Sequence, residues 1–193
     1  MDAERARHLQ QLGITAWERR PSDAAPEQGL SPPEAINWAD LEARVAACRL
    51  CGLHSTRTRT VFGVGHRNAS LMIVGEAPGQ NEDLQGEPFV GRAGQLLNAM
   101  LAAIGLGRDD VFITNVLKCR PPSNRDPSVA ESEQCRVYLN RQIQLIGPRL
   151  LLAVGRIAAQ TLLGTTTSIG ALRGREHTYA PAGLENPKKS PSW

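Results

Sequence analysis

The sequence has few aromatic side chains, no long apolar run and only four cysteines among its 193 residues. No stretch approaches the ~20 apolar residues of a membrane-spanning helix, and the start of the chain, Met1 to Arg5, lacks the apolar segment of a secretion signal. We therefore expect an intracellular, cytoplasmic protein whose thiols stay reduced. Four cysteines in such a chain are more typical of a metal site than of two disulfides, which remain the alternative for a secreted protein.

Composition limits the size of the fold more than it limits the function. Hydrophobic residues make up 41% of the chain, and the formal net charge is +3. A chain of this length typically forms one domain, and this apolar content is enough for a packed core. The small positive charge is compatible with a nucleic-acid partner, but it is equally common on a solvated surface.

The spacing of the cysteines indicates one site built from distant segments. Cys48 and Cys51 form a C-x2-C pair, which can present two sulfurs to one metal centre, whereas Cys119 and Cys135 are too far apart in the chain to do so locally. Zinc and iron–sulfur clusters both accept four thiolates. Because zinc sites usually contain two short pairs, a [4Fe–4S] cluster is the preferred interpretation, with zinc and unconnected core cysteines as alternatives.

Short apolar strands alternate with helices in the main part of the chain. Strands are predicted at residues 71–74, 111–116 and 150–154, and helices at residues 38–47, 94–104, 129–146 and 156–163. Continuous apolar strands between helices indicate a parallel sheet covered on both faces. Polar residues follow the strands, and ligands of such sheets bind at the carboxyl ends of strands.

The two ends of the chain differ from this pattern. Residues 1–36 are expected to form a short helix at 3–12 followed by a Pro-rich linker, and residues 1–35 are a candidate contact for a replication or repair protein. Residues 183–193 form a polar, proline-containing tail that cannot be a buried strand. The predicted main domain is residues 37–182.

Three motifs in order carry a family resemblance: residues 75–83 (GEAPGQNED), 86–94 (GEPFVGRAG) and 114–122 (TNVLKCRPP). They resemble the family 4 uracil-DNA glycosylases, the iron–sulfur enzymes of the uracil-DNA glycosylase superfamily, over roughly residues 45–182. The resemblance implies a doubly wound, three-layer α/β/α fold and a [4Fe–4S] cluster on the four cysteines. It also implies excision of uracil from single- or double-stranded DNA; we expect a monomer.

The resemblance assigns uracil binding to two side chains in particular. Asn115 matches the residue whose amide can pair with uracil N3–H and O4, and Phe89 matches the residue that stacks on the flipped base. Without the family, Asn115 is equally interpretable as a turn or capping residue. Phe89 alone would more commonly be a core residue, although the surrounding proline and glycines favour a loop.

Four further residues are predicted to line the uracil and the attacking water. Glu76, Ala77 and Pro78 match the pocket loop, with Glu76 and Ala77 also expected at the catalytic centre. In the best-known branch of the superfamily, an aspartate that positions water occupies the place of Ala77. Because an alanine cannot do this, the water is expected to be held by the backbone or by a carboxylate such as Glu82. Taken alone, the segment is also compatible with an ordinary strand-to-helix loop.

Several cations and small polar residues near the motifs are candidate phosphate contacts, because helix N-termini and scattered cations suit DNA backbones. A solvated surface is the alternative for each of them. The candidates are Arg92, Gly94, Lys118, Arg120, Ser123, Asn124 and Arg125.

The sequence departs from the family near its C-terminus. The family's His-Pro signature, whose histidine donates a hydrogen bond to uracil O2 on a further strand and loop, does not occur in this chain. His177 precedes the missing segment and is not an evident substitute. We expect a truncated or rearranged C-terminus, impaired activity, and an exposed apolar edge at residues 150–154. The alternative function is a catalytically inactive protein that binds uracil-containing or abasic DNA.

Overall fold

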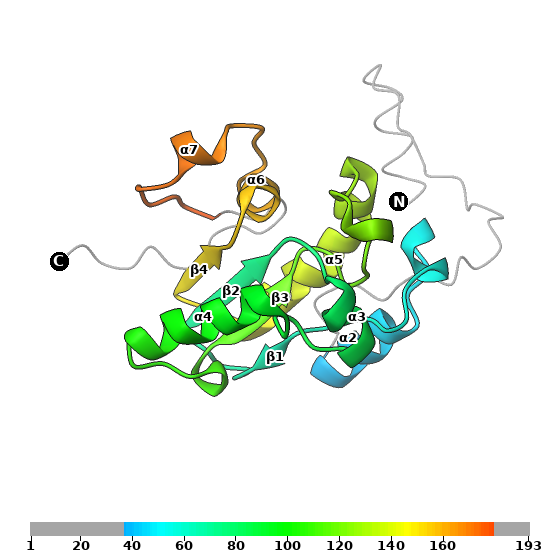
Figure 1. Ribbon diagram of the computed structural model, residues 1–193, viewed down its shortest axis with the longest axis horizontal. Helices are drawn as coiled ribbons and strands as arrows, with labels where there is room; N and C mark the ends of the chain where they lie inside the picture. Colours follow the sequence, from blue (N-terminus) through cyan, green and yellow to red (C-terminus); the bar gives the residue numbers. More distant parts are fainter. Residues whose placement is uncertain (1–36, 180–193) are drawn as a thin grey trace, which may run out of the picture. The chain divides into compact units, whose positions relative to one another are not determined.

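A four-stranded sheet lies at the centre of the computed structural model, which describes residues 37–179 (Figure 1). The strands lie in the order β1 (Val64–Gly65), β3 (Phe112–Asn115), β2 (Leu71–Gly75) and β4 (Leu150–Ala153). β2 pairs in parallel with both β3 and β4, and β1 is antiparallel to β3. This confirms the predicted mainly parallel sheet. The predicted N-terminal arm, residues 1–36, and the tail, residues 183–193, lie outside the described residues.

Helices pack on both faces of the sheet because the apolar strand residues alternate between the two sides. Met72, Val74 and Phe112 share one core with residues of α2 and α5, whereas Ile73 and Ile113 pack with residues of α4. Figure 1 shows α4 and α5 separated by the strands. The helices are α2 (Trp38–Ala46), α3 (Gln80–Gln85), α4 (Arg92–Ala103), α5 (Val129–Ile146), α6 (Arg156–Leu163) and α7 (Ile169–Leu172), with 3-10 turns η2 (Gly52–Ser55), η3 (Arg108–Asp110) and η4 (Pro122–Asn124).

Helix α5 has the bounds that the sequence predicts, because both of its ends carry strong local signals. At the N-terminus, the Ser128 hydroxyl accepts a hydrogen bond from the Glu131 amide, and the Glu131 carboxylate accepts one from the Ser128 amide. At the C-terminus, Gly147 adopts the left-handed conformation with φ of 58°. The helix crosses one face of the sheet and carries Cys135 and Gln142.

The shortest elements were not predicted from the sequence. β1 has only two residues and α3 only six, so neither is long enough to show a period of apolar residues. Helix α4 begins at Arg92, two residues before the predicted start at Gly94. The predicted strands 111–116 and 150–154 are each shorter in the structure, because hydrogen bonding ends where the chain turns away from the sheet.

Strand β4 is the last strand of the sheet among the described residues and has one unpaired edge. Alternate apolar side chains of this strand are also accessible: Leu150 is 60% exposed and Leu152 is 42% exposed. The predicted exposed apolar edge is therefore confirmed for residues 37–179. Within this range no helix is both long and apolar enough to cross a membrane.

Candidate active site and cysteine pocket

The first candidate site is a pocket of about 310 Å³ at the carboxyl ends of β2 and β3. Because these strands are parallel and Gly75 lies opposite Asn115, the loops that follow them meet at one edge of the sheet. Gly75 makes the meeting possible, since a Cβ atom there would collide with Asn115 Oδ1 and the Phe89 ring. The pocket is lined by Glu76, Ala77, Gly79, Glu82, Phe89, Ala93, Asn115 and Val154.

The Asn115 side chain is available to a ligand. The residue is only 2% exposed, yet its side-chain amide makes no hydrogen bond with any residue in the described part of the chain. Nearly all buried amides in proteins have such partners. A nearly buried amide that lines a pocket and has no partner among residues 37–179 indicates a site for a polar ligand.

The Phe89 ring forms another wall of the same pocket. Phe89 is half-buried, and its backbone adopts φ of 54°, in the left-handed region that large side chains rarely occupy. Its carbonyl packs against Gly94 in the first turn of α4, where a Cβ atom would collide with it. Gly94 therefore has a packing role, and the predicted loop position of Phe89 agrees with the structure.

Glu82 holds the loop that carries Phe89. Its Oε1 accepts hydrogen bonds from the backbone amides of Val90 and Gly91 at 2.9 and 3.0 Å. Asp83 acts similarly on the other side of α3, where it accepts hydrogen bonds from the Thr58 amide. Glu82 thus lines the pocket as a loop anchor, a role that the sequence did not suggest.

Glu76 places a second carboxyl group on the pocket wall, and Ala77 lies beside it. Burial raises the pKa of Glu76, and the nearby Asp126 carboxylate raises it further, whereas Arg156 lowers it. The Arg156 guanidinium also pairs with Asp126, with 2.6 Å between Nη2 and Oδ2. Pro78 is buried and, among residues 37–179, is not part of the pocket lining.

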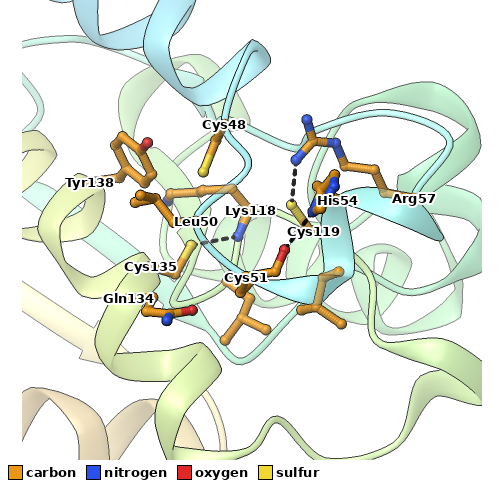
Figure 2. Close-up of a pocket in the computed structure, with 12 residues that line it drawn as sticks. Cys48, Leu50, Cys51, His54, Arg57, Lys118, Cys119, Gln134, Cys135 and Tyr138 are labelled. Carbon is orange, nitrogen blue, oxygen red and sulfur yellow. Dashed lines mark hydrogen bonds between the residues drawn. The ribbon is translucent and has the colours of Figure 1, made fainter. Parts of the chain in front are cut away.

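The second candidate site is a pocket where all four cysteines meet (Figure 2). Cys48 follows α2, Cys51 precedes η2, Cys119 lies beyond β3, and Cys135 belongs to α5. In the sequence the four cysteines form two pairs that are far apart. The structure brings both pairs together in this pocket. The other lining residues are Leu50, Leu53, His54, Arg57, Leu117, Lys118, Gln134 and Tyr138.

Hydrogen-bond donors face two of the sulfurs. Arg57 Nη1 lies 3.1 Å from Cys119 Sγ, and the Lys118 amide lies 3.2 Å from Cys135 Sγ. Burial raises the pKa of the Cys135 thiol to about 11, against the opposing effect of Lys118. No group of three or more His, Cys, Asp or Glu side chains within residues 37–179 is arranged to hold a metal ion.

Lys118 corrects one sequence-based prediction. It was expected to contact DNA phosphates, but the residue is only 1% exposed. Its ammonium group donates hydrogen bonds to Thr114 Oγ1, the Asn115 carbonyl and Gln142 Oε1 at 2.6, 2.8 and 2.7 Å. Burial lowers the pKa of Lys118 to about 7. A side chain enclosed in this way cannot reach a phosphate, so Lys118 belongs to the support of β3.

The remaining predicted DNA contacts are compatible with the structure. Arg92 is exposed at the start of α4, and its side chain makes no hydrogen bond or ion pair with another described residue. Arg120 donates to Asn124 at 2.7 Å, and Arg125 pairs with Glu131 at the same distance. Arg92 is thus the most available of these cations.

No histidine among residues 37–179 lines the pocket that contains Asn115. His177 Nε2 lies 2.8 Å from the Leu172 carbonyl, and His54 Nδ1 lies 2.7 Å from the Cys51 carbonyl. Both histidines lie outside the lining of that pocket among the described residues.

Comparison with known proteins assigns these features to a family. Residues 62–193 match the uracil DNA glycosylase superfamily. The type-4 uracil-DNA glycosylase of Archaeoglobus fulgidus is 51% identical over 140 residues, which cover 70% of this chain and 70% of that protein. The chain belongs to the uracil-DNA glycosylase superfamily. Type-4 enzymes of Sulfurisphaera tokodaii and Thermotoga maritima are each 45% identical, over 72% and 68% of this chain and 66% and 69% of their own lengths.

Membership of the superfamily confirms the family 4 resemblance and the α/β fold class that the sequence predicted. Within this fold, each of the three sequence motifs contributes residues to the lining of the pocket at the ends of β2 and β3. Three contacts were missed, because no spacing rule connects the residues with their partners: Arg57 with Cys119, Glu82 with the amides of the Phe89 loop, and Asp126 with Arg156.

Proposed function

We propose that the protein excises uracil from DNA by hydrolysing the N-glycosidic bond. Its relatives are named type-4 uracil-DNA glycosylases and are 44–51% identical to it. The observation that best supports the proposal is the unpaired Asn115 amide beside the Phe89 ring in one pocket. A planar base with hydrogen-bonding groups on its edge matches both of these walls.

Recognition begins with removal of the base from the DNA stack, because its edge is unreachable inside a duplex. The flipped uracil then stacks on Phe89, a contact that contributes about 1–3 kcal/mol for bases on aromatic rings. The side-chain oxygen of Asn115, Oδ1, accepts the uracil N3–H, and its side-chain NH₂ group donates to O4. Cytosine has an amino group and an unprotonated N3 at these positions, so it is mismatched on both sides.

The attacking water is held by the loop after β2. Ala77 has no polar side chain, and Glu82 Oε1 is occupied by the Val90 and Gly91 amides. Glu76 is therefore the best-placed carboxylate for this water, together with backbone groups of residues 76–78. A raised pKa makes the Glu76 carboxylate a stronger base once it is ionised.

DNA is held by cations around the pocket, with Arg92 as the main phosphate contact and Arg120 and Arg125 as further candidates. The substrate is uracil-containing DNA, single- or double-stranded, and the protein acts as a cytoplasmic monomer. A contact between residues 1–35 and another replication or repair protein remains part of the proposal, and that segment lies outside the described residues.

The four cysteines would hold a [4Fe–4S] cluster. Zinc is the alternative, because zinc and a four-iron cluster both accept four thiolates. The cluster is preferred because only one of the two cysteine pairs is short, whereas zinc sites usually contain two short pairs. The donors on Cys119 and Cys135 suit thiolates of this kind. When bound, the cluster would crosslink three chain segments.

The second candidate function is recognition of uracil or abasic DNA without catalysis. It is favoured by the absence of a histidine from the pocket lining within residues 37–179. A donor aimed at the charge that develops on the departing base can contribute a factor of about 10²–10³ in rate. The protein would then bind damaged DNA through Asn115 and Phe89 but release no base.

An excision assay on the full chain distinguishes the two functions. Excess protein is incubated with labelled single- and double-stranded oligonucleotides that contain uracil or thymine, and abasic sites are quantified after alkali. Asn115→Ala is the pocket variant, and Asn68→Ala, an exposed turn residue, is its matched control. Uracil-dependent cleavage lost only in Asn115→Ala supports the glycosylase. Uracil-selective binding without cleavage supports the second function, and failure of both rejects the pocket assignment.

A further inference from the structure

The backbone of Phe89 needs external support. Its φ of 54° lies in the left-handed region, where the side chain of a bulky residue clashes with its own backbone. Such a conformation persists only when surrounding contacts fix it. Phe89 is not in a helix or strand, so its support must come from side chains that bind the loop.

Arg108 provides that support from η3. Its Nη1 lies 3.2 Å from the Phe89 carbonyl, and its Nη2 lies 2.7 Å from the Pro88 carbonyl. The same guanidinium pairs with the Glu87 carboxylate at 2.9 Å and donates to Asn98 Oδ1 at 3.2 Å. One side chain therefore binds three consecutive residues, which the planar fork of an arginine can do and a lysine cannot.

The other end of the same loop is held by a second residue, Glu82, through the Val90 and Gly91 amides. Arg108 thus holds the carbonyl groups before and at Phe89, while Glu82 holds the amides after it. The Arg108 side chain is only 22% exposed, and it is not among the described residues that line the base pocket. Any effect of Arg108 on the base must act through this loop.

We propose that Arg108 is a positioning residue that fixes the Phe89 ring as the stacking wall of the base pocket. The role in excision rests on the proposed function, whereas the role in fixing the loop does not. The competing explanation is an ordinary ion pair between Arg108 and Glu87 that contributes only to stability. The two carbonyl contacts distinguish these explanations, because they remain when Glu87 loses its charge.

The test compares Arg108→Met and Arg108→Lys with Glu87→Gln, the matched control that removes the ion pair alone. Two quantities are measured on the full, cluster-loaded chain: hydrogen exchange of the Val90 and Gly91 amides, and single-turnover excision of uracil. We expect Arg108→Met to accelerate exchange in this loop and to lower the excision rate about 10- to 100-fold, as small displacements of binding groups do. For Arg108→Lys, both the amide exchange rate and the excision rate should lie between those of Arg108→Met and the wild type. Glu87→Gln should remain within about twofold of the wild-type value in both measurements.

A double-mutant cycle tests whether Arg108 acts through Phe89. In a Phe89→Ala background, Arg108→Met should lower excision by less than about twofold further. If Arg108→Met lowered the excision rate in this background as much as it does in the wild type, the proposal would be overturned. Unchanged hydrogen exchange of the Val90 and Gly91 amides in Arg108→Met would also overturn it. If the wild-type protein excises no uracil, the proposed function fails, and the exchange of the loop amides alone decides whether Arg108 fixes the loop. If Arg108→Met does not fold, Arg108→Lys supplies the same comparisons.

Discussion

Replacement of Lys118 by methionine tests whether this side chain supports the fold or contacts DNA. The variant removes the Lys118 donor from three acceptors, Thr114 Oγ1, the Asn115 carbonyl and Gln142 Oε1, all within a buried network. Thr114 Oγ1 keeps its own hydrogen bond to the Phe62 carbonyl, so two acceptors lose their partner. Each buried acceptor left without a partner costs about 1–3 kcal/mol, and the two together cost about 2–6 kcal/mol. Methionine fills similar space without a charge to desolvate, which places the expected loss near 3 kcal/mol.

Thermal unfolding and salt-dependent DNA binding measure the two possibilities separately. For a chain of this size, a loss of 3 kcal/mol lowers Tm by about 6–12 °C. Arg92→Met is the matched control: it should change stability by less than about 0.5 kcal/mol, and it should reduce the slope of log binding constant against log salt by about 1. Lys118→Met should leave that slope unchanged. A Lys118→Met protein with wild-type Tm and a reduced slope would show that Lys118 contacts DNA and does not support the fold through the buried network.

Three further predictions concern the cysteine pocket and two carboxyl groups. Cys119→Ala should reduce bound iron below about four atoms per chain and lower Tm, measured by iron analysis and thermal unfolding; wild-type values of both would contradict a cluster that joins distant segments. The pKa of Glu131 is lowered to about 2 by Arg125, so this pair should stabilise the protein above the ordinary pKa of 4.5, with the contribution lost as pH falls through about 2. The free energy of unfolding, measured with urea between pH 5 and 2, should therefore depend less on pH in Arg125→Met than in the wild type. Identical pH profiles of the two proteins would refute the pairing. Asp126→Asn should lower the pKa of Glu76, followed by NMR titration, because it removes a repulsive carboxylate and frees Arg156; an increase would reject this explanation.

The sequence predicted the regular elements well wherever local chemistry was strong. Helix α5 was predicted to the residue, and in the structure capping contacts at Ser128 and Gly147 fix its two ends; the buried strands were recognised by their continuous apolar runs. β1 and α3 were missed because two and six residues are too few to show periodicity. Lys118 was misassigned because a lysine in a motif rich in cations resembles a surface residue until its burial is known.

The sequence by itself determined the alternation of strands and helices, the family motifs and the separation of the cysteines into two pairs. These properties are local, so they can be read from neighbouring residues. Only the tertiary structure decided that Asn115 is unpaired on a pocket wall, that Lys118 is enclosed, and that Arg108 and Glu82 hold the Phe89 loop. Hydrogen bonds between side chains and distant backbone groups depend on how the sheet brings loops together, and no spacing along the chain encodes them.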